Sequence, residues 1–180
     1  MWNHTVSILI GGQSRRMGAP KHLIELPNGN TMLQQMLLFA HSTATNVVIV
    51  GGVINGYTSI HDHRDKQGPL AGIEALLDSG IDERYLVVGC DMPLLTKDVV
   101  APLLCGDEVA VFTHNGFIFS LPIMICSDSI AACSAYLDSS RRSIKGFLSE
   151  ISPTTVHLDD SHVGAMMGMN TPDDISNLFI

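Results

Sequence analysis

The sequence has few cysteines, few basic residues and no long hydrophobic segment. Its four cysteines, Cys90, Cys105, Cys126 and Cys133, form no C-x-x-C pair, so a reduced protein is expected rather than a disulfide framework. No apolar run approaches the roughly 20 residues that a membrane helix needs. The N-terminus also lacks the basic segment and apolar stretch of a signal peptide. We therefore expect a cytoplasmic protein with no membrane partner.

Basic side chains are scarce: 10 Lys and Arg stand against 18 Asp and Glu, for a net charge of -8. General nucleic-acid binding would need a basic face, so this class of function is disfavoured. Hydrophobic residues make up 46% of the chain and charged residues 16%, which is typical of a folded globule. A length of 180 residues predicts a single domain that spans residues 1–180.

One loop combines glycines with several of the scarce basic residues. An apolar run over residues 6–10 predicts a buried strand, and the string GGQSRRMGAPK follows it at positions 11–21. Glycines permit close approach of the backbone to a ligand, and successive N–H groups in such a turn form an anion nest. Arg16 and Lys21 add charge that suits phosphate oxygens. The loop predicts a polyphosphate site, although a glycine-rich turn with solvated basic side chains is the alternative.

Asp91 ends a second apolar strand and precedes Met92-Pro93. A lone carboxylate in this position is costly to bury unless it is paired or bound to a metal. Mg²⁺ needs few protein carboxylates, because waters and substrate phosphates complete its coordination. Asp91 is therefore a candidate magnesium ligand, and a turn aspartate that caps the following segment is the alternative.

Strand-like and helix-like segments alternate along the chain, which predicts an α/β protein with a mainly parallel sheet covered by helices. The strands are expected at residues 5–10, 46–50, 85–88, 108–112, 117–125 and 154–158. The helices are expected at residues 31–41, 68–77, 98–104, 127–137, 143–151 and 172–179. Asn115-Gly116 favours a hairpin, so the second half should contain an antiparallel portion. Residues 1–105 are predicted to bind a nucleotide, and residues 106–180 to shape the acceptor site.

Five motifs in this order resemble the molybdenum cofactor guanylyltransferase family of the nucleotidyltransferases. They are GG-x-x-x-R-M-G-x-x-K at residues 11–21, GPLAG at 68–72, VVGCDMPLL at 87–95, RRS at 141–143 and NTPDD at 170–174. The resemblance implies a three-layer, Rossmann-like nucleotidyltransferase fold. It also implies Mg²⁺-dependent transfer of GMP from GTP to molybdopterin, with Arg16, Lys21 and Asp91 as the catalytic residues.

The resemblance also assigns binding residues. The expected nucleotide contacts are Leu9, Ile10, Gly11, Gly12, Lys21, Asp62 and Asp91. Asp65 is the rival to Asp62, and a transition-metal site at His61 and His63 is a further alternative for that segment. Asn170, Arg141 and Arg142 are expected near the acceptor, and the alternatives are a turn residue for Asn170 and a solvated helix-end pair for the arginines.

Three positions depart from the family pattern and bear on which base and acceptor are used. Ile10 precedes the glycines where alanine is more frequent, His22 follows the lysine, and Gly168 stands where another asparagine is frequent. The alternatives are therefore CTP with molybdopterin, another triphosphate with a sugar phosphate, or a noncatalytic pterin or nucleotide carrier. Transient contacts with other cofactor-biosynthesis proteins or with target apoenzymes are also expected.

Overall fold

The computed structural model describes residues 4–10, 20–106 and 108–176. Its elements, in chain order, are β1 (Thr5–Leu9), η1 (Lys21–Leu23), α1 (Met32–Thr43), β2 (Asn46–Val50), β3 (Thr58–Ile60), α2 (Pro69–Asp78), β4 (Arg84–Gly89), α3 (Lys97–Val100), η2 (Ala101–Leu104), β5 (Ala110–His114), β6 (Phe117–Cys126), η3 (Ser127–Ser129), α4 (Ile130–Asp138), α5 (Ile144–Ile151), β7 (Thr154–His157), η4 (Asp160–Met166) and α6 (Pro172–Ser176), where η denotes a 3-10 helix.

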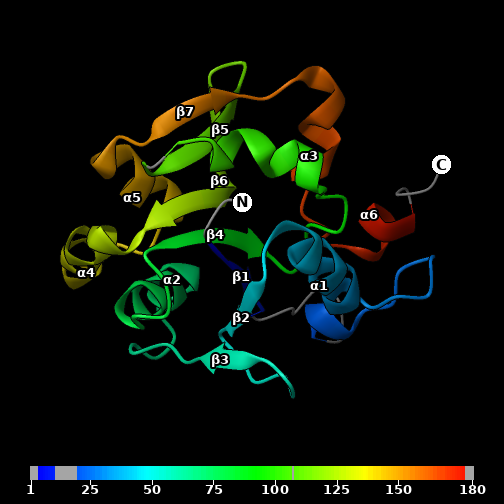
Figure 1. The fold of residues 1–180 in the computed structure, drawn as a ribbon, viewed down its shortest axis with the longest axis horizontal. Helices are drawn as coiled ribbons and strands as arrows, with labels where there is room; N and C mark the ends of the chain where they lie inside the picture. The colour runs from blue at the N-terminus through cyan, green and yellow to red at the C-terminus, as the bar shows by residue number, and fades with distance from the viewer. Residues whose placement is uncertain (1–3, 11–19, 107, 177–180) are drawn as a thin grey trace.

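The described residues form a seven-stranded mixed sheet in the order β3-β2-β1-β4-β6-β5-β7. Strands β1 to β4 pair in parallel, and β7 pairs in parallel with β5. Only β6 runs against its neighbours β4 and β5 among the described strands. Figure 1 shows the sheet from β3 at the bottom to β7 at the top, with helices on both sides. The predicted three-layer fold with an antiparallel portion is confirmed.

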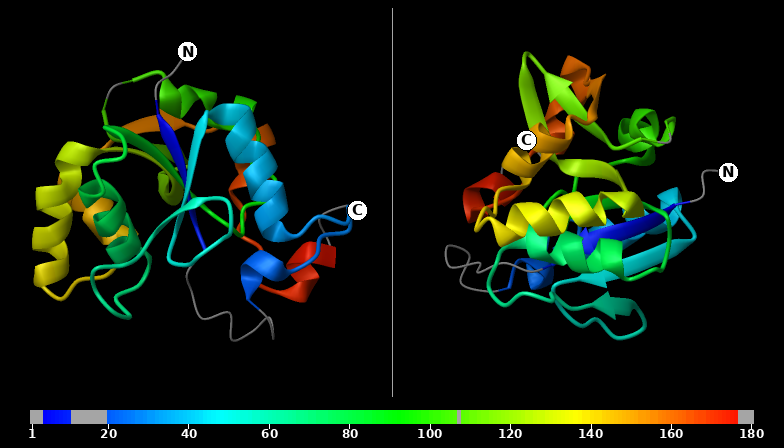
Figure 2. Two further views of the ribbon diagram at one scale, coloured as in Figure 1. Left: turned by 60° about the horizontal axis from the view of Figure 1, so that its bottom comes forward. Right: turned by 90° about the vertical axis from the view of Figure 1, so that its left-hand side faces the viewer.

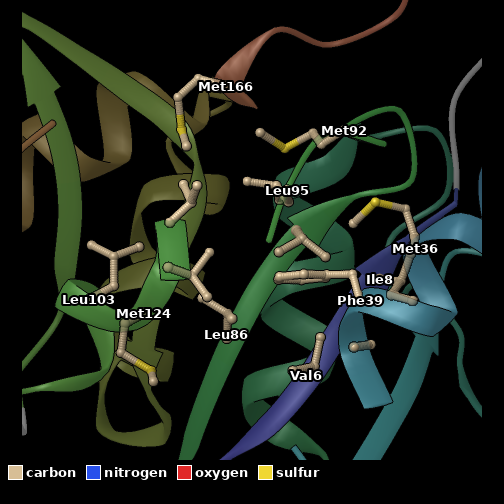
Figure 3. Close-up of a cluster of buried hydrophobic side chains, with 14 of the residues drawn as sticks. Val6, Ile8, Met36, Phe39, Leu86, Met92, Leu95, Leu103, Met124 and Met166 are labelled. Carbon is tan, nitrogen blue, oxygen red and sulfur yellow. The ribbon is translucent and has the colours of Figure 1, made fainter. Parts of the chain in front are cut away.

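The sheet separates the two larger clusters of the core, one on each of its faces. Alternate side chains of β1 point to opposite faces, so Val6 and Ile8 pack toward α1 while Leu9 packs toward α2. Figure 2 shows α2, α4 and α5 gathered on one side of the sheet and α1 on the other. Figure 3 shows the α1-side cluster, in which Met92 and Leu95 are anchored beside β1 and β4. This anchoring fixes the segment that follows Asp91.

Most predicted elements are confirmed, including the helix that Thr31 caps by accepting a hydrogen bond from the Gln34 N–H. Two expected helices are only partly α-helical. Residues 98–104 change from α3 to the 3-10 helix η2, where Pro102 has no N–H to donate. Residues 127–137 begin with the 3-10 turn η3. Strand β3 and helix η4 were not predicted, and the last part of the predicted closing helix, residues 177–179, lies outside the described residues.

The hairpin between β5 and β6 provides a test of the fold. Asn115 and Gly116 have φ angles of 49° and 76°, as a tight turn with two left-handed residues requires. We expect Gly116→Ala to lower the free energy of unfolding by about 1 kcal/mol, because alanine is strained at this φ. Urea denaturation of the purified variant measures the change.

Gly164→Ala is the matched control. A Cβ at either glycine would meet no atom within 4 Å, but Gly164 lies outside the left-handed region of φ. Equal destabilisation by both substitutions would contradict the assignment of strain to Gly116.

Candidate active site

The parallel register of β1 and β4 brings two functional loops to one edge of the sheet. Leu9 pairs with Gly89, and the Cys90 N–H donates to the Leu9 carbonyl at 3.0 Å. Ile10 and Asp91 therefore leave the sheet side by side, at the carboxyl ends where ligands of open α/β sheets bind. Ile10 also donates its N–H to the Val50 carbonyl at 2.9 Å. Gly11, Gly12 and Arg16 lie outside the described residues.

The Asp91 side chain is held between two glycines. A Cβ on Gly89 would lie 2.6 Å from Asp91 Oδ1, and a Cβ on Gly168 would lie 3.3 Å from Asp91 Oδ2. The Met169 N–H donates to the Asp91 carbonyl at 2.8 Å, which joins the 168–170 segment to the end of β4. The departure from the family pattern at Gly168 thus has a physical role, because a larger residue would crowd the carboxylate.

Lys21 joins Asp91 to Asn170. Its Nζ donates to Asp91 Oδ2 at 2.7 Å and to Asn170 Oδ1 at 2.6 Å. The side chains of Lys21 and Asp91 are 20% and 26% exposed, so the pair is partly sheltered and still open to a ligand. Asp91 and Asn170 lie 70 and 149 positions after Lys21 in the sequence, and the fold brings all three into one cluster.

Asp174 fixes the orientation of Asn170, and this role was not predicted. Its Oδ2 accepts the N–H groups of Asn170 and Thr171 at 2.8 Å each, and these bonds hold the pKa of Asp174 below its usual range. Asp174 in turn donates its N–H to Thr171 Oγ1 at 3.2 Å. The Asn170 side chain donates to the Gly168 carbonyl at 2.8 Å, which turns its Oδ1 toward Lys21. The Thr-x-x-Asp spacing of a reciprocal cap was the signal that could have revealed Asp174.

Asp62 lies at the same edge of the sheet, against the first turn of α2. A Cβ built on Gly72 would lie 3.1 Å from Asp62 Oδ1, 2.7 Å from Val50 Cγ1 and 4.0 Å from Leu9 Cδ2. Partial burial of the carboxyl raises the pKa of Asp62. Gly72 thus adjoins both Asp62 and Val50 at the end of β2. The choice of Asp62 over Asp65 as the nucleotide-contacting aspartate stays a prediction.

The alternative metal site near Asp62 gains no support. His63 Nε2 lies 3.5 Å from Asp78 Oδ2, on the exposed surface of α2. Within the described ranges, no group of three or more His, Cys, Asp or Glu side chains is placed to hold a metal ion. His61 and His63 therefore have no third ligand in that part of the chain.

Arg141 and Arg142 are not brought to the Lys21 cluster. Arg141 donates to both carboxylate oxygens of Glu150, at 2.5 and 3.3 Å, and its guanidinium lies 4.1 Å from the centroid of the Tyr136 ring. Arg142 donates to the Leu137 carbonyl at 3.0 Å. Both residues lie between α4 and α5, which Figures 1 and 2 place across the molecule from α6. Their acceptor-binding role stays a prediction.

Comparison with known proteins agrees with this arrangement. Residues 6–154 match the family model described as the MobA-like NTP transferase domain. The chain belongs to this family. The resemblance drawn from the five motifs is thereby confirmed, and the protein is a nucleotidyltransferase.

No helix in the described ranges is long and apolar enough to cross a membrane.

Similar proteins carry consistent names. The chain is 32% identical to a probable molybdenum cofactor guanylyltransferase of Carboxydothermus hydrogenoformans over 123 residues, which cover 64% of this chain and 62% of that relative. It is 26% identical to the molybdenum cofactor guanylyltransferase of Xanthomonas euvesicatoria, over 95% of this chain and 92% of the other. The fold matches molybdopterin-guanine dinucleotide biosynthesis protein A of Archaeoglobus fulgidus with a TM-score of 0.78, at 21% identity, over 96% of this chain and 95% of that one.

Cys90 lies beside Asp91 but is not exposed to the site. Burial raises the pKa of the Cys90 thiol to about 12, and burial has the same effect on Cys133. Because the thiolate is the reactive form, both side chains should be inert at pH 8. Cys105 is exposed. We expect iodoacetamide to alkylate Cys105 in the folded protein and to spare Cys90 and Cys133, as peptide mass spectrometry can measure.

The same reaction in urea, where the chain is unfolded, is the control and should label all of these cysteines. Rapid alkylation of Cys90 in the folded protein would contradict its assignment as a buried thiol.

Proposed function

We propose that the protein transfers GMP from GTP to molybdopterin and releases pyrophosphate. The observation that carries the proposal is the cluster of Lys21, Asp91 and Asn170 at the carboxyl ends of β1 and β4. The names of the relatives supply the nucleotide and the acceptor. In the reaction, an acceptor phosphate oxygen forms a bond to the α-phosphorus, and the bond from that phosphorus to the bridging oxygen breaks as pyrophosphate leaves.

The chain's own residues would act by position and charge. Nucleotidyl transfer needs little covalent help from a protein, because placement and electrostatic stabilisation supply most of the acceleration. The Lys21 ammonium would neutralise charge on the triphosphate, and Asn170 would hold that ammonium at the site. Arg16 of the glycine-rich loop is proposed to share this role, and Leu9, Ile10, Gly11, Gly12 and Asp62 to contact the nucleoside.

The Asp91 carboxylate suits a magnesium ion. Mg²⁺ is typically bound through one or two carboxylates together with water and substrate phosphates. Asp91 offers a partly exposed carboxylate, held in place by Gly89 and Gly168. When bound, the ion would supply charge neutralisation at the triphosphate.

Pyrophosphate release tests the proposed substrates directly. Purified protein would be supplied with GTP, CTP or ATP, each with Mg²⁺ and with or without molybdopterin. We expect release only when GTP and molybdopterin are present together. Release with CTP alone among the triphosphates would overturn the guanylyl assignment, and no release by a folded, nucleotide-binding protein would favour a carrier.

Substitutions at the ion pair test the catalytic assignment. We expect Asp91→Asn and Lys21→Met each to lower kcat by about 10²-fold or more, because each removes a charge at the reacting phosphates. Both variants should fold, since a partly exposed ion pair contributes only about 1 kcal/mol or less. Without nucleotide, Lys21→Met should also bind Mn²⁺ more tightly than the wild-type protein, because an ammonium no longer competes for Asp91. Isothermal titration calorimetry measures this affinity.

Lys97→Met and Asp98→Asn, on the exposed first turn of α3, are matched charge controls. Wild-type turnover in Lys21→Met or Asp91→Asn, or losses of equal size in the controls, would contradict the assignment.

A further inference from the structure

The segment that carries Asp62 is attached to α2 at two points. Asp62 lies against Gly72, and two residues later Arg64 pairs with Glu74. Both contacts join positions ten apart, so residues 62–64 lie alongside residues 72–74 of the helix. The position of Asp62 at the sheet edge is thus linked, over a short stretch of backbone, to the Arg64–Glu74 pair.

Arg64 makes three charge-assisted hydrogen bonds. Its Nε and Nη2 donate to the two carboxylate oxygens of Glu74 at 2.7 and 2.8 Å, and its Nη1 donates to Asp138 Oδ1 at 2.7 Å. Asp138 is the last residue of α4, so one side chain connects the segment to two helices. Bidentate pairing of a guanidinium with a carboxylate fixes direction as well as distance.

Glu74 is an unusual residue in its helix. The side chain is 6% exposed, and its neighbours on α2 include the buried residues Ile73 and Ala75. Hydrogen bonds from Arg64 hold the pKa of Glu74 below its usual range, so it stays ionised. A buried ion pair is seldom more stable than apolar residues of the same volume, and its distinctive effect is orientation. The orientation fixed here is that of the segment bearing Asp62.

We propose that Arg64 is a positioning residue for nucleotide binding. It holds Asp62 against Gly72 of α2, the residue of that helix that also adjoins Val50 at the end of β2. Arg64 itself points to Glu74 and Asp138, so it acts on the ligand through Asp62. The proposal rests on the nucleotide site of the proposed function.

The test is a double-mutant cycle with Arg64→Lys and Asp62→Asn. Arg64→Lys keeps the charge and loses the bidentate geometry. Because small displacements of a binding group are costly, we expect Arg64→Lys to raise the KM for GTP about tenfold, with kcat changed less than twofold. Asp62→Asn should have a similar effect, and the double variant should be no worse than the more impaired single variant. Equilibrium binding of GTP by calorimetry gives the same comparison without turnover.

Hydrogen exchange supplies a readout that needs no ligand. Arg64→Lys should increase amide exchange in residues 61–67 while the thermal midpoint stays close to that of the control. The control is Arg84→Lys: Arg84 is likewise a hydrogen-bonded arginine, donating to the Gly106 carbonyl, but it lies at the start of β4, at the opposite end of the strand from Asp91.

The outcomes separate this proposal from the proposed function. Unchanged GTP affinity in Arg64→Lys, or effects that add in the double variant, would overturn the positioning role while guanylyl transfer stands. If the wild-type protein instead uses CTP, the same cycle is measured with CTP. Non-additive effects of the two substitutions on CTP binding would support the positioning role of Arg64 and overturn only the choice of base.

Discussion

The parallel pairing of β1 with β4 is the constraint on which the site depends. Leu9 and Gly89 are opposite each other, so the chain leaves both strands at one level, and the proposed function has the two following loops bind one ligand. A shift of one residue would turn Asp91 to the other face of the sheet. Such a shift would also turn Val6 and Ile8 from the α1 face of the sheet to the α2 face and disrupt both clusters, so the hydrophobic core enforces the geometry of the polar site.

The site also requires backbone segments to pass close to the Asp91 carboxylate, and glycines at two positions make this possible. Gly89 belongs to β4, and Gly168 belongs to the segment that returns after η4. The backbone bond from Met169 to Asp91 holds that segment at the end of β4, and Asp174 then turns Asn170 toward Lys21. The last part of the chain thus completes a site that the first half begins.

Local signals predicted much of this fold because they coincide with tertiary packing. The Thr31 cap, the Asn115-Gly116 turn and the β-branched run of β2 each favour the structure that the core also requires. Strand β3 has only three residues, two of them polar, and it is ordered by pairing with β2, which no local pattern encodes. The order of the motifs identified Lys21, Asp91 and Asn170 as candidate site residues. That they lie within hydrogen-bonding distance of one another depends on the long-range topology of the fold. Arg64 and Asp174 were missed because each acts through a neighbour and not as a ligand group.

The net negative charge of the protein determines how a triphosphate can be bound with few basic residues. A protein of net charge -8 repels a triphosphate at long range, so affinity must come from cations placed at the site. In the described cluster, Lys21 already offsets Asp91, which leaves almost no net positive charge for the ligand. Under the proposed function, the additional positive charge is expected from a divalent cation and from the arginines of the glycine-rich loop. Nucleotide and metal should therefore bind cooperatively, because phosphates that draw Lys21 away also release the carboxylate that suits the metal.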